Sequence, residues 1–247
     1  MIKLGITGCT GKLGNSIIQQ IKQHKNIELA VAVTRKGNCL VGEKIANTQV
    51  IIEDDLSALQ KSNVIIDCTN AISFRQNIQI YKALEKPLVI ATTGFSDLDM
   101  EKIAELSKNI PIIISGNFSI ALFNFLMAVR SYAAGISHDT DITIIELHHK
   151  TKKDAPSGTA KMIRKAIIEA NPCIQEQEIT IQSVRAGSIF GEHQVIFATN
   201  SDEVITMKHS VSSRKSFSDG ALWVAEWIYN QCPQLYTMYD FIKATRG

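Results

Sequence analysis

Apolar positions in the first half of the chain follow two alternating spacings. At helical spacing, Leu13, Ile17, Ile18 and Ile21 mark one apolar face, and a later stretch repeats the pattern. Between such stretches lie short β-branched runs, predicted as strands at residues 2–6, 27–33, 64–68, 88–92 and 112–115. Strands that are apolar throughout and separated by helices indicate a parallel sheet covered on both faces. The first half is therefore predicted to be a Rossmann-like, doubly wound α/β domain.

The pattern changes after about residue 118. An Ala- and Leu-rich helix is predicted at 121–134, and both tryptophans fall on a second helix at 220–231. Strand candidates between them lie at 142–147, 179–185, 194–198 and 204–209. This spacing is typical of an α+β domain on an antiparallel or mixed sheet. We expect residues 1–119 and 214–247 to form the dinucleotide-binding domain, 120–213 the substrate and oligomerisation domain, and the substrate to bind between them.

Composition narrows the class of protein. With 45% hydrophobic and 20% charged residues, the 247-residue chain has ordinary globular composition. A net charge of +2, with scattered lysines and arginines, gives no basis for nucleic-acid binding. The five cysteines are far apart and form no C-x-x-C pair, which indicates reduced thiols in a cytoplasmic protein and no zinc site. The chain shows no signal-peptide pattern, and its apolar runs are too short to span a membrane.

A glycine-rich loop stands where the first predicted strand becomes the first helix. Gly8, Gly11 and Gly14 have the spacing G-x-x-G-x-x-G, where the commoner fingerprint is G-x-G-x-x-G. Free amides and the positive dipole end of a helix bind pyrophosphate, although a tight turn alone also collects glycine. The position at the first β-to-α junction predicts a dinucleotide-binding loop.

The end of the second predicted strand bears on the choice of dinucleotide. An NAD-preferring site usually has Asp or Glu about 20 residues beyond the glycines. That point is Thr34, and two cations, Arg35 and Lys36, follow it. Cations bind a 2′-phosphate, although a solvated turn would have the same composition. We expect NADPH, with NADH possible.

Glu146 to Ala160, ELHHKTKKDAPSGTA, combines several kinds of chemistry. His148 can donate a proton near neutral pH, and Lys152 adds a positive charge. Ser157 or Thr159 can cap the following helix, whose free amides would bind a carboxylate. Paired histidines also suggest a metal, but adjacent strand residues point to opposite faces and no third ligand stands nearby. Each fragment alone suits a solvated loop or a helix start; together they predict an active site for an anionic substrate.

This run resembles the E-x-H-H-x-x-K-x-D-A-P-S-G-T-A signature of the 4-hydroxy-tetrahydrodipicolinate reductase (dihydrodipicolinate reductase) family of lysine and diaminopimelate biosynthesis. The resemblance covers nearly the whole chain. It includes the glycine loop and the segments ATTGF (91–95), GNFS (116–119), RAGSIFGEH (185–193) and HSVSSRKSFSDGA (209–221). It implies an NAD(P)H-dependent oxidoreductase that forms a homotetramer. It also implies hydride transfer to a cyclic imine or enamine formed as water leaves.

The resemblance assigns roles residue by residue. His148 would be the proton donor and Lys152 the catalytic lysine, and Arg35 would meet the adenosine ribose or its 2′-phosphate. The substrate carboxylates would be bound by His149, Lys152, Gly158 and Thr159. The pyrophosphate would be held by Gly8, Cys9, Thr10, Gly11, Lys12 and Leu13. The nicotinamide would be lined by Ala91, Thr92, Thr93, Ser115, Gly116, Asn117 and Phe118.

A few positions depart from the family pattern, all at the cofactor. Thr34 stands where many members have an acidic residue; the other departures are Cys68, Asn70-Ala71, Ala91 and Ser115-Gly116. They are expected to alter nicotinamide affinity more than reduction itself. Two rivals stay open. One is another NAD(P)-dependent dehydrogenase of a dicarboxylate or amino acid, and the other a non-catalytic dinucleotide-binding regulator.

Overall fold

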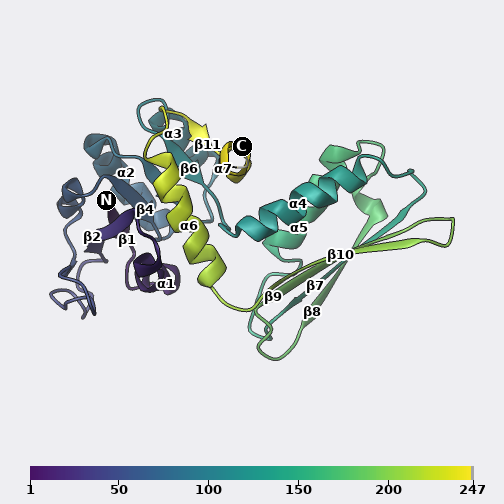
Figure 1. The fold of residues 1–247 in the computed structure, drawn as a ribbon, viewed down its shortest axis with the longest axis horizontal. Helices are drawn as coiled ribbons and strands as arrows, with labels where there is room; N and C mark the ends of the chain where they lie inside the picture. The colour runs from purple at the N-terminus through teal and green to yellow at the C-terminus, as the bar shows by residue number, and fades with distance from the viewer. Residues whose placement is uncertain (246–247) are drawn as a thin grey trace. The chain divides into compact units, whose positions relative to one another are not determined.

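The chain folds into two compact units, which we describe from a computed structural model covering residues 1–245. Unit 1 consists of Met1–Ser119 together with the segment that begins at Arg214, and unit 2 is Ile120–Ser213 (Figure 1). Within residues 1–245, no helix is long and apolar enough to cross a membrane. The two units are described separately below.

Unit 1 is built on a seven-stranded sheet whose strands all pair in parallel. The strand order is β11-β6-β5-β4-β1-β2-β3, which places the topological switch point between β1 and β4. Open parallel sheets bind ligands outside the carboxyl ends of the strands at this point. The strands are β1 (Ile2–Thr7), β2 (Ile27–Val33), β3 (Ile52–Glu53), β4 (Val64–Asp67), β5 (Leu88–Ile90), β6 (Ile112–Ile114) and β11 (Leu235–Tyr236).

Helices cover both faces of this sheet. Side chains of α2 and α3, including Phe74, Tyr81 and Ile103, pack with Leu88 and Ile90 of the sheet in one apolar core. On the other side, α1 and α6 lie against each other, and Ser218 of α6 donates to Ser16 of α1 at 2.5 Å. The helices of unit 1 are α1 (Lys12–Gln20), α2 (Ala71–Leu84), α3 (Asp97–Leu106), α6 (Lys215–Ile228) and α7 (Met238–Thr245).

Unit 2 is a four-stranded mixed sheet of order β10-β9-β7-β8. The pairs β10–β9 and β9–β7 are antiparallel, and β7–β8 is parallel. Burial alternates strictly along β7 and β9, so one face of the sheet is covered by α4 and α5 (Figure 1). The elements are α4 (Ile120–Ala133), β7 (Asp141–His148), α5 (Gly158–Ala170), β8 (Ile179–Arg185), β9 (Gly191–Ala198) and β10 (Val204–Val211).

The predicted fold class, a doubly wound parallel sheet with a second domain on a mixed sheet, is confirmed. Several predicted boundaries differ from the structure. The strands expected to reach residues 68, 92 and 115 end at Asp67, Ile90 and Ile114, where the backbone turns away in loops. The helix expected at 220–231 spans Lys215–Ile228, because its polar first turn hides its beginning from an apolar pattern. Short edge strands such as β3 and β11 have too few residues to show a period.

Candidate active site

The glycine loop joins the carboxyl end of β1 to the start of α1. Gly8 has φ +72°, and a Cβ there would lie 2.5 Å from the Cys68 carbonyl oxygen, so only glycine fits this turn. Gly11 is the N-cap residue of α1 and has no side chain to accept the amide hydrogens of the first turn. Burial raises the pKa of the Cys9 thiol to about 11, so this residue remains an uncharged thiol. The loop therefore offers backbone amides to an anion.

A cavity of about 480 Å³ opens beside this loop, at the carboxyl ends of β1, β2 and β4. Its wall includes Thr10 and Thr34, whose hydroxyl oxygens are 2.8 Å apart, and the two predicted cations Arg35 and Lys36. Asp54 lines the same cavity. The end of the second strand, followed by Thr34 and Arg35, has no carboxylate of its own. The structure supplies one from the adjacent strand, since Val33 pairs with Glu53 and Asp54 follows.

A buried carboxylate, Asp67, organises the carboxyl ends of β1, β4 and β5. It is 0% exposed and accepts hydrogen bonds from the hydroxyl groups of Thr7 (3.1 Å), Thr92 (2.6 Å), Thr69 (2.8 Å) and Tyr81, and from the Thr69 amide (3.0 Å). The hydrogen bond from the Thr92 hydroxyl to Asp67 holds the 91–95 loop against the carboxyl end of β4. The role of Asp67 was not predicted from the sequence, because Asp67 belongs to an otherwise apolar strand segment.

The two loops predicted to line the nicotinamide lie against each other. A Cβ at Gly116 would be 3.2 Å from the Thr93 methyl carbon, which places segments 91–95 and 116–119 in contact. The Ser115 hydroxyl donates to the Asn117 carbonyl and accepts from the Asn117 amide (3.1 Å). Phe118 is only 1% exposed. The side chains of Thr92, Ser115 and Phe118 thus fix the shape of these two loops.

In unit 2, the predicted catalytic run spans the end of β7 and the start of α5. His148 is the last residue of β7 and is 8% exposed. The Ser157 hydroxyl caps α5 by accepting from the Ala160 amide at 3.1 Å, so Ser157, rather than Thr159, is the cap residue. The amide of Ser157 donates to Glu146 at 3.2 Å. The intervening first-turn residues are Gly158 and Thr159, the two predicted to bind a substrate carboxylate.

Glu146 is a fully buried carboxylate beside His148. Its Oε2 accepts from His148 Nδ1 and from Arg185 Nη1 at 3.0 Å, and its Oε1 accepts from Arg185 Nη2 at 2.7 Å. Burial alone would raise the pKa of Glu146, but the hydrogen bonds, led by those from Arg185, hold it at about 2. Burial lowers the pKa of His148, and the charge of Glu146 opposes that effect. The buried carboxylate stays ionised and fixes the tautomer of the imidazole.

Lys152 and His149 stand in the loop that follows β7. The Lys152 ammonium is 2.8 Å from Asp154 Oδ1, and its charge acts on His148. His149 Nδ1 is 2.7 Å from the Thr151 hydroxyl, so its ring serves a different contact from that of His148. Among residues 1–245, no group of three His, Cys, Asp or Glu side chains is arranged to hold a metal ion. The loop instead presents positive charge next to the start of α5.

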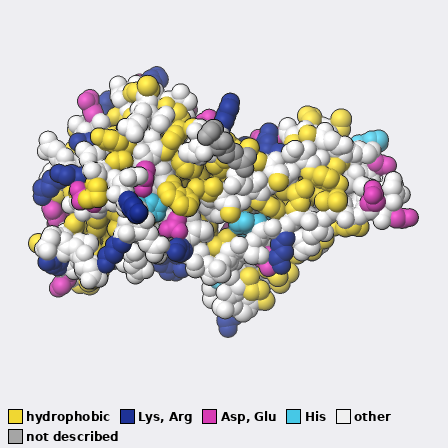
Figure 2. Space-filling view, viewed as in Figure 1, with side chains coloured by type: hydrophobic (Ala, Val, Ile, Leu, Met, Phe, Trp, Pro, Cys, Tyr) yellow, Lys and Arg dark blue, Asp and Glu magenta, His cyan; other side chains and the backbone are white. Residues whose placement is uncertain are grey.

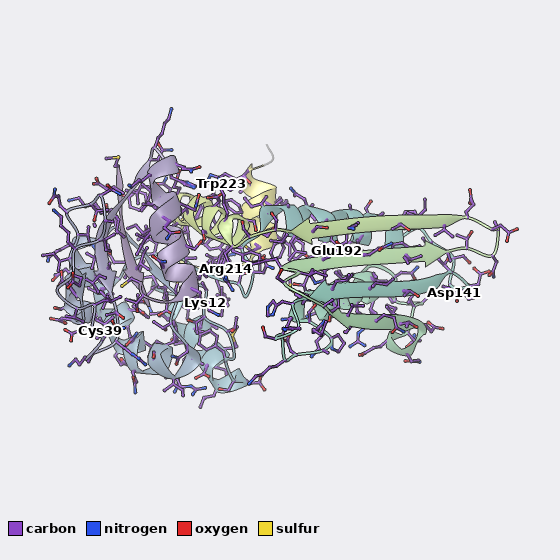
Figure 3. The ribbon with its side chains drawn as sticks, turned by 90° about the horizontal axis from the view of Figure 1, so that it is seen from below. Lys12, Cys39, Asp141, Glu192, Arg214 and Trp223 are labelled. Atoms are coloured by element: carbon purple, nitrogen blue, oxygen red, sulfur yellow. The ribbon has the colours of Figure 1, made fainter. Side chains whose placement is uncertain are left out.

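Three further residues of this site were not predicted from the sequence, because they come from other strands. They are Arg185 on β8, His193 on β9 and His209 on β10. Glu146 pairs with His193 across β7 and β9, and His193 pairs with His209 across β9 and β10, which sets the three side chains in a row on one sheet face. Arg185 ends β8, in register with His148. Figure 3 shows this end of the sheet at Glu192 and the opposite end at Asp141. The signal was present in the segments 185–193 and 209–221, but their roles depend on strand register.

Both halves of the chain match models of one protein family. A family model described as "Dihydrodipicolinate reductase, N-terminus" matches residues 2–118, and one described as "Dihydrodipicolinate reductase, C-terminus" matches residues 123–242. The chain belongs to the dihydrodipicolinate reductase family. Proteins named 4-hydroxy-tetrahydrodipicolinate reductase are 37% identical in Caldanaerobacter subterraneus subsp. tengcongensis (98% of this chain, 99% of that protein) and 34% identical in Rickettsia bellii (98% and 95%).

A solved structure of the dihydrodipicolinate reductase family has the same fold. Dipicolinate-bound dihydrodipicolinate reductase from Paenisporosarcina sp. TG-14 superimposes with a TM-score of 0.81 at 24% identity, covering 96% of this chain and 97% of that one. Aspartate semialdehyde dehydrogenase II of Vibrio cholerae gives a TM-score of 0.63 at 13% identity. The fold is thus shared with another dehydrogenase, whereas family membership rests on the sequence matches.

Proposed function

We infer that this protein is a 4-hydroxy-tetrahydrodipicolinate reductase, which reduces its substrate with a nicotinamide dinucleotide. The observation that carries the proposal is the arrangement at the end of β7. There Glu146 orients His148 beside Lys152 and the capped start of α5, in a chain that matches the reductase family over both units. This combination suits a dicarboxylate that must be held by positive charge while one of its atoms is protonated.

The residues of each unit have distinct tasks in this proposal. The glycine loop from Gly8 to Leu13 binds pyrophosphate through its amides, and the loops 91–95 and 115–118 hold the nicotinamide ring. These loops would hold a reduced nicotinamide dinucleotide, whose chemistry would be hydride donation for reduction of the cyclic imine or enamine that forms as water leaves. His149, Lys152, Gly158 and Thr159 bind the substrate carboxylates, and His148 or Lys152 donates the proton.

The environment of His148 suits a proton donor. Burial and the positive charges of Lys152 and Arg185 lower the pKa of His148, which makes the imidazolium a stronger acid. Glu146 holds Nδ1 and stabilises the charged form, so Nε2 is the nitrogen that exchanges its proton. His148→Gln is expected to lower kcat by about 10²-fold, the usual scale for loss of a general acid.

The proposed preference for NADPH over NADH depends on charges around the ribose cavity. Arg35 and Lys36 attract a 2′-phosphate, whereas Asp54 would repel one and accept hydrogen bonds from ribose hydroxyls. Arg35→Ala should raise KM for NADPH while sparing NADH, and Asp54→Asn should raise KM for NADH instead. Initial rates with each dinucleotide test both variants. Equal effects on the two cofactors would contradict the 2′-phosphate role of Arg35.

We also propose a homotetramer in the cytoplasm. The face of the unit 2 sheet away from α4 and α5 has half-exposed apolar side chains, among them Ile145, Leu147 and Ile196, which suits an interface between subunits. All five cysteines are free, as reduced thiols of a cytoplasmic protein would be. Light scattering after size-exclusion chromatography measures the mass, and a monomer or dimer would contradict the tetramer.

One assay tests the activity and separates the rivals. The purified protein is mixed with NADPH or NADH and the product of dihydrodipicolinate synthase, and loss of reduced-nicotinamide absorbance is followed. We expect turnover that depends on the substrate. Absence of turnover with both dinucleotides would refute the proposal; retained cofactor binding would then favour a regulator, and turnover with another dicarboxylate or amino acid would favour a different dehydrogenase.

A further inference from the structure

Two segments have no task in the reaction described so far, yet both reach the His148 site. RAGSIFGEH begins with Arg185 at the end of β8 and ends with His193 on β9. HSVSSRKSFSDGA begins with His209 on β10, opposite His193 in the antiparallel register. The ring of His193 lies 5.2 Å from that of His148 and 6.4 Å from that of His209, measured between centroids. The site therefore draws side chains from all four strands of unit 2.

Glu146 is the centre of this arrangement. Donors reach both oxygens of its carboxylate: Ser157 N (3.2 Å) and Arg185 Nη2 (2.7 Å) at Oε1, and Arg185 Nη1 (3.0 Å) and His148 Nδ1 at Oε2. The Ser183 side chain on β8 also hydrogen-bonds to this carboxylate. A carboxylate has about four lone-pair sites, so these donors saturate it. The Arg185 guanidinium also donates to the Asp154 carbonyl at 2.6 Å, so the same group holds the loop that contains Lys152.

The hydrogen bonds of Glu146 connect two groups with different proposed roles, His148 and Ser157. His148 is the proposed proton donor, and Ser157 opens the helix whose next two residues are proposed to bind a carboxylate. Both are held by one rigid, fully buried group. We propose that Glu146 and Arg185 act as a positioning pair that fixes the proton donor relative to the carboxylate-binding start of α5. This inference rests on the proposed function for the roles of His148 and α5.

The charged and titratable groups that face His148 come from every neighbouring element. They are Glu146 on β7, Lys152 with its partner Asp154 in the following loop, Arg185 on β8, His193 on β9 and, beyond it, His209 on β10. Burial lowers the pKa of His193 to about 3 and also lowers that of His209, so both are neutral near pH 7. Glu146 favours the charged form of His148, whereas Arg185 and Lys152 oppose it.

This difference in sign gives a test that a merely structural role would not pass. Protein labelled with ¹⁵N-histidine is titrated by NMR, and the His148 signals are identified by their loss in His148→Gln. Removal of the negative charge in Glu146→Gln should shift the His148 titration to lower pH by on the order of one pH unit. Arg185→Gln should shift it to higher pH. Arg185→Lys, which keeps the charge, should leave it near the wild-type midpoint.

Kinetics with the full-length protein complete the experiment. Glu146→Gln should lower kcat by about 10- to 100-fold and shift the pH profile of kcat in the same direction as the NMR midpoint, with KM for the dinucleotide unchanged. The matched control is Glu192→Gln. Glu192 is also a strand glutamate paired with a cation, Lys208 at 2.7 Å, but lies on the other sheet face. This control should leave both the midpoint and kcat unchanged.

The outcomes separate this inference from the proposed function. Opposite NMR shifts for Glu146→Gln and Arg185→Gln support the positioning pair even if the protein fails to reduce the proposed substrate. Shifts in the same direction, or none, overturn it even if the wild type is an active reductase. If Glu146→Gln does not fold, as judged by circular dichroism, Glu146→Asp keeps the charge on a shorter side chain. It should keep the midpoint and lose kcat; an unchanged kcat would overturn the proposal.

Discussion

The backbone of α6 lies so close to the 116–119 segment that a glycine-to-alanine substitution in this helix should destabilise the protein, although such a substitution in a helix is usually stabilising. Gly220 lies inside α6, and replacing a helical glycine with alanine ordinarily stabilises a protein by about 0.5–1 kcal/mol. At Gly220 a Cβ would lie 1.8 Å from the carbonyl oxygen of Phe118 and 2.8 Å from its carbonyl carbon. We therefore expect Gly220→Ala to destabilise unit 1.

The magnitude follows from what must move. Both contacted atoms belong to backbone, so no side-chain rotation relieves the overlap, and α6 and the loop must separate by more than about 1 Å. Overpacking in a core costs about 1–3 kcal/mol, occasionally more, and Phe118, Leu222 and Ala221 around the contact are all buried. An overlap as close as 1.8 Å with backbone places the cost near the upper end of this range, at about 3 kcal/mol. After subtraction of the ordinary alanine gain of about 0.5–1 kcal/mol, we expect the free energy of unfolding to fall by about 2–2.5 kcal/mol.

Both tryptophans of the protein, Trp223 and Trp227, lie on α6, so intrinsic fluorescence reports on unit 1. Urea unfolding followed by fluorescence should show a lower midpoint for Gly220→Ala with a similar m-value. KM for the dinucleotide should rise as well, because the displaced loop is the one proposed to hold the nicotinamide. Gly158→Ala is the control for a helical glycine with open space around it, since a Cβ at Gly158 has nothing within 4 Å. Because α5 belongs to unit 2, its stability is measured by amide hydrogen exchange of α5.

A wild-type midpoint in Gly220→Ala would refute the reasoning. It would mean that α6 can shift away from Phe118 at no cost, and that the close approach does not require glycine. An equal loss of stability in Gly158→Ala, measured by hydrogen exchange of α5, would also count against it. In that case the loss would reflect alanine substitution in general rather than the contact with Phe118.

Two further predictions concern buried polar groups. Asp67→Asn replaces a carboxylate that accepts five hydrogen bonds with an amide that also donates. This substitution should lower the free energy of unfolding of unit 1 by about 1–3 kcal/mol in urea and raise KM for the dinucleotide. The control Asp97→Asn, at an exposed position, should change neither. Burial lowers the pKa of His193 from 6.5 to about 3, so the unfolded chain binds a proton that the folded one does not, and stability is lost as pH falls from 6.5 to 3. This loss should reach roughly 3–5 kcal/mol in unit 2, measured by amide hydrogen exchange of β9, and His193→Gln should remove most of it; an equally steep loss in the variant would contradict the assignment.

The parts of the structure that the sequence predicted share a local signal. Strands such as β4 and β6 follow from consecutive β-branched residues, and the start of α5 follows from a cap residue before an apolar helical face. The partners of Glu146 have no such signal. Arg185 lies 39 residues away, and only the parallel register of β7 with β8 brings it to the carboxylate. Asp54 was not predicted for the same reason: it follows β3, the neighbour of β2, and lines the cavity from there.

Side chains have different roles in the two proposed sites. In unit 1 they hold the loops in place, and in unit 2 they carry the proposed chemistry. Around the proposed cofactor site, the Thr92 hydroxyl donates to Asp67, the Ser115 hydroxyl donates to the Asn117 carbonyl and the Cys9 thiol is buried, so these three side chains hold the loops in place. Substitutions at such positions preserve the site if they preserve the loop. In unit 2 the carboxylate of Glu146 is saturated, and its donors also fix other parts of the site. The departures at Cys68, Ala91 and Ser115-Gly116 all lie in loops of unit 1. Any effect of these departures is therefore expected on cofactor affinity, through a change in the position of a loop. The proposed chemistry at the end of β7 depends instead on the side chains of His148, Glu146 and Arg185, which hydrogen-bond to one another.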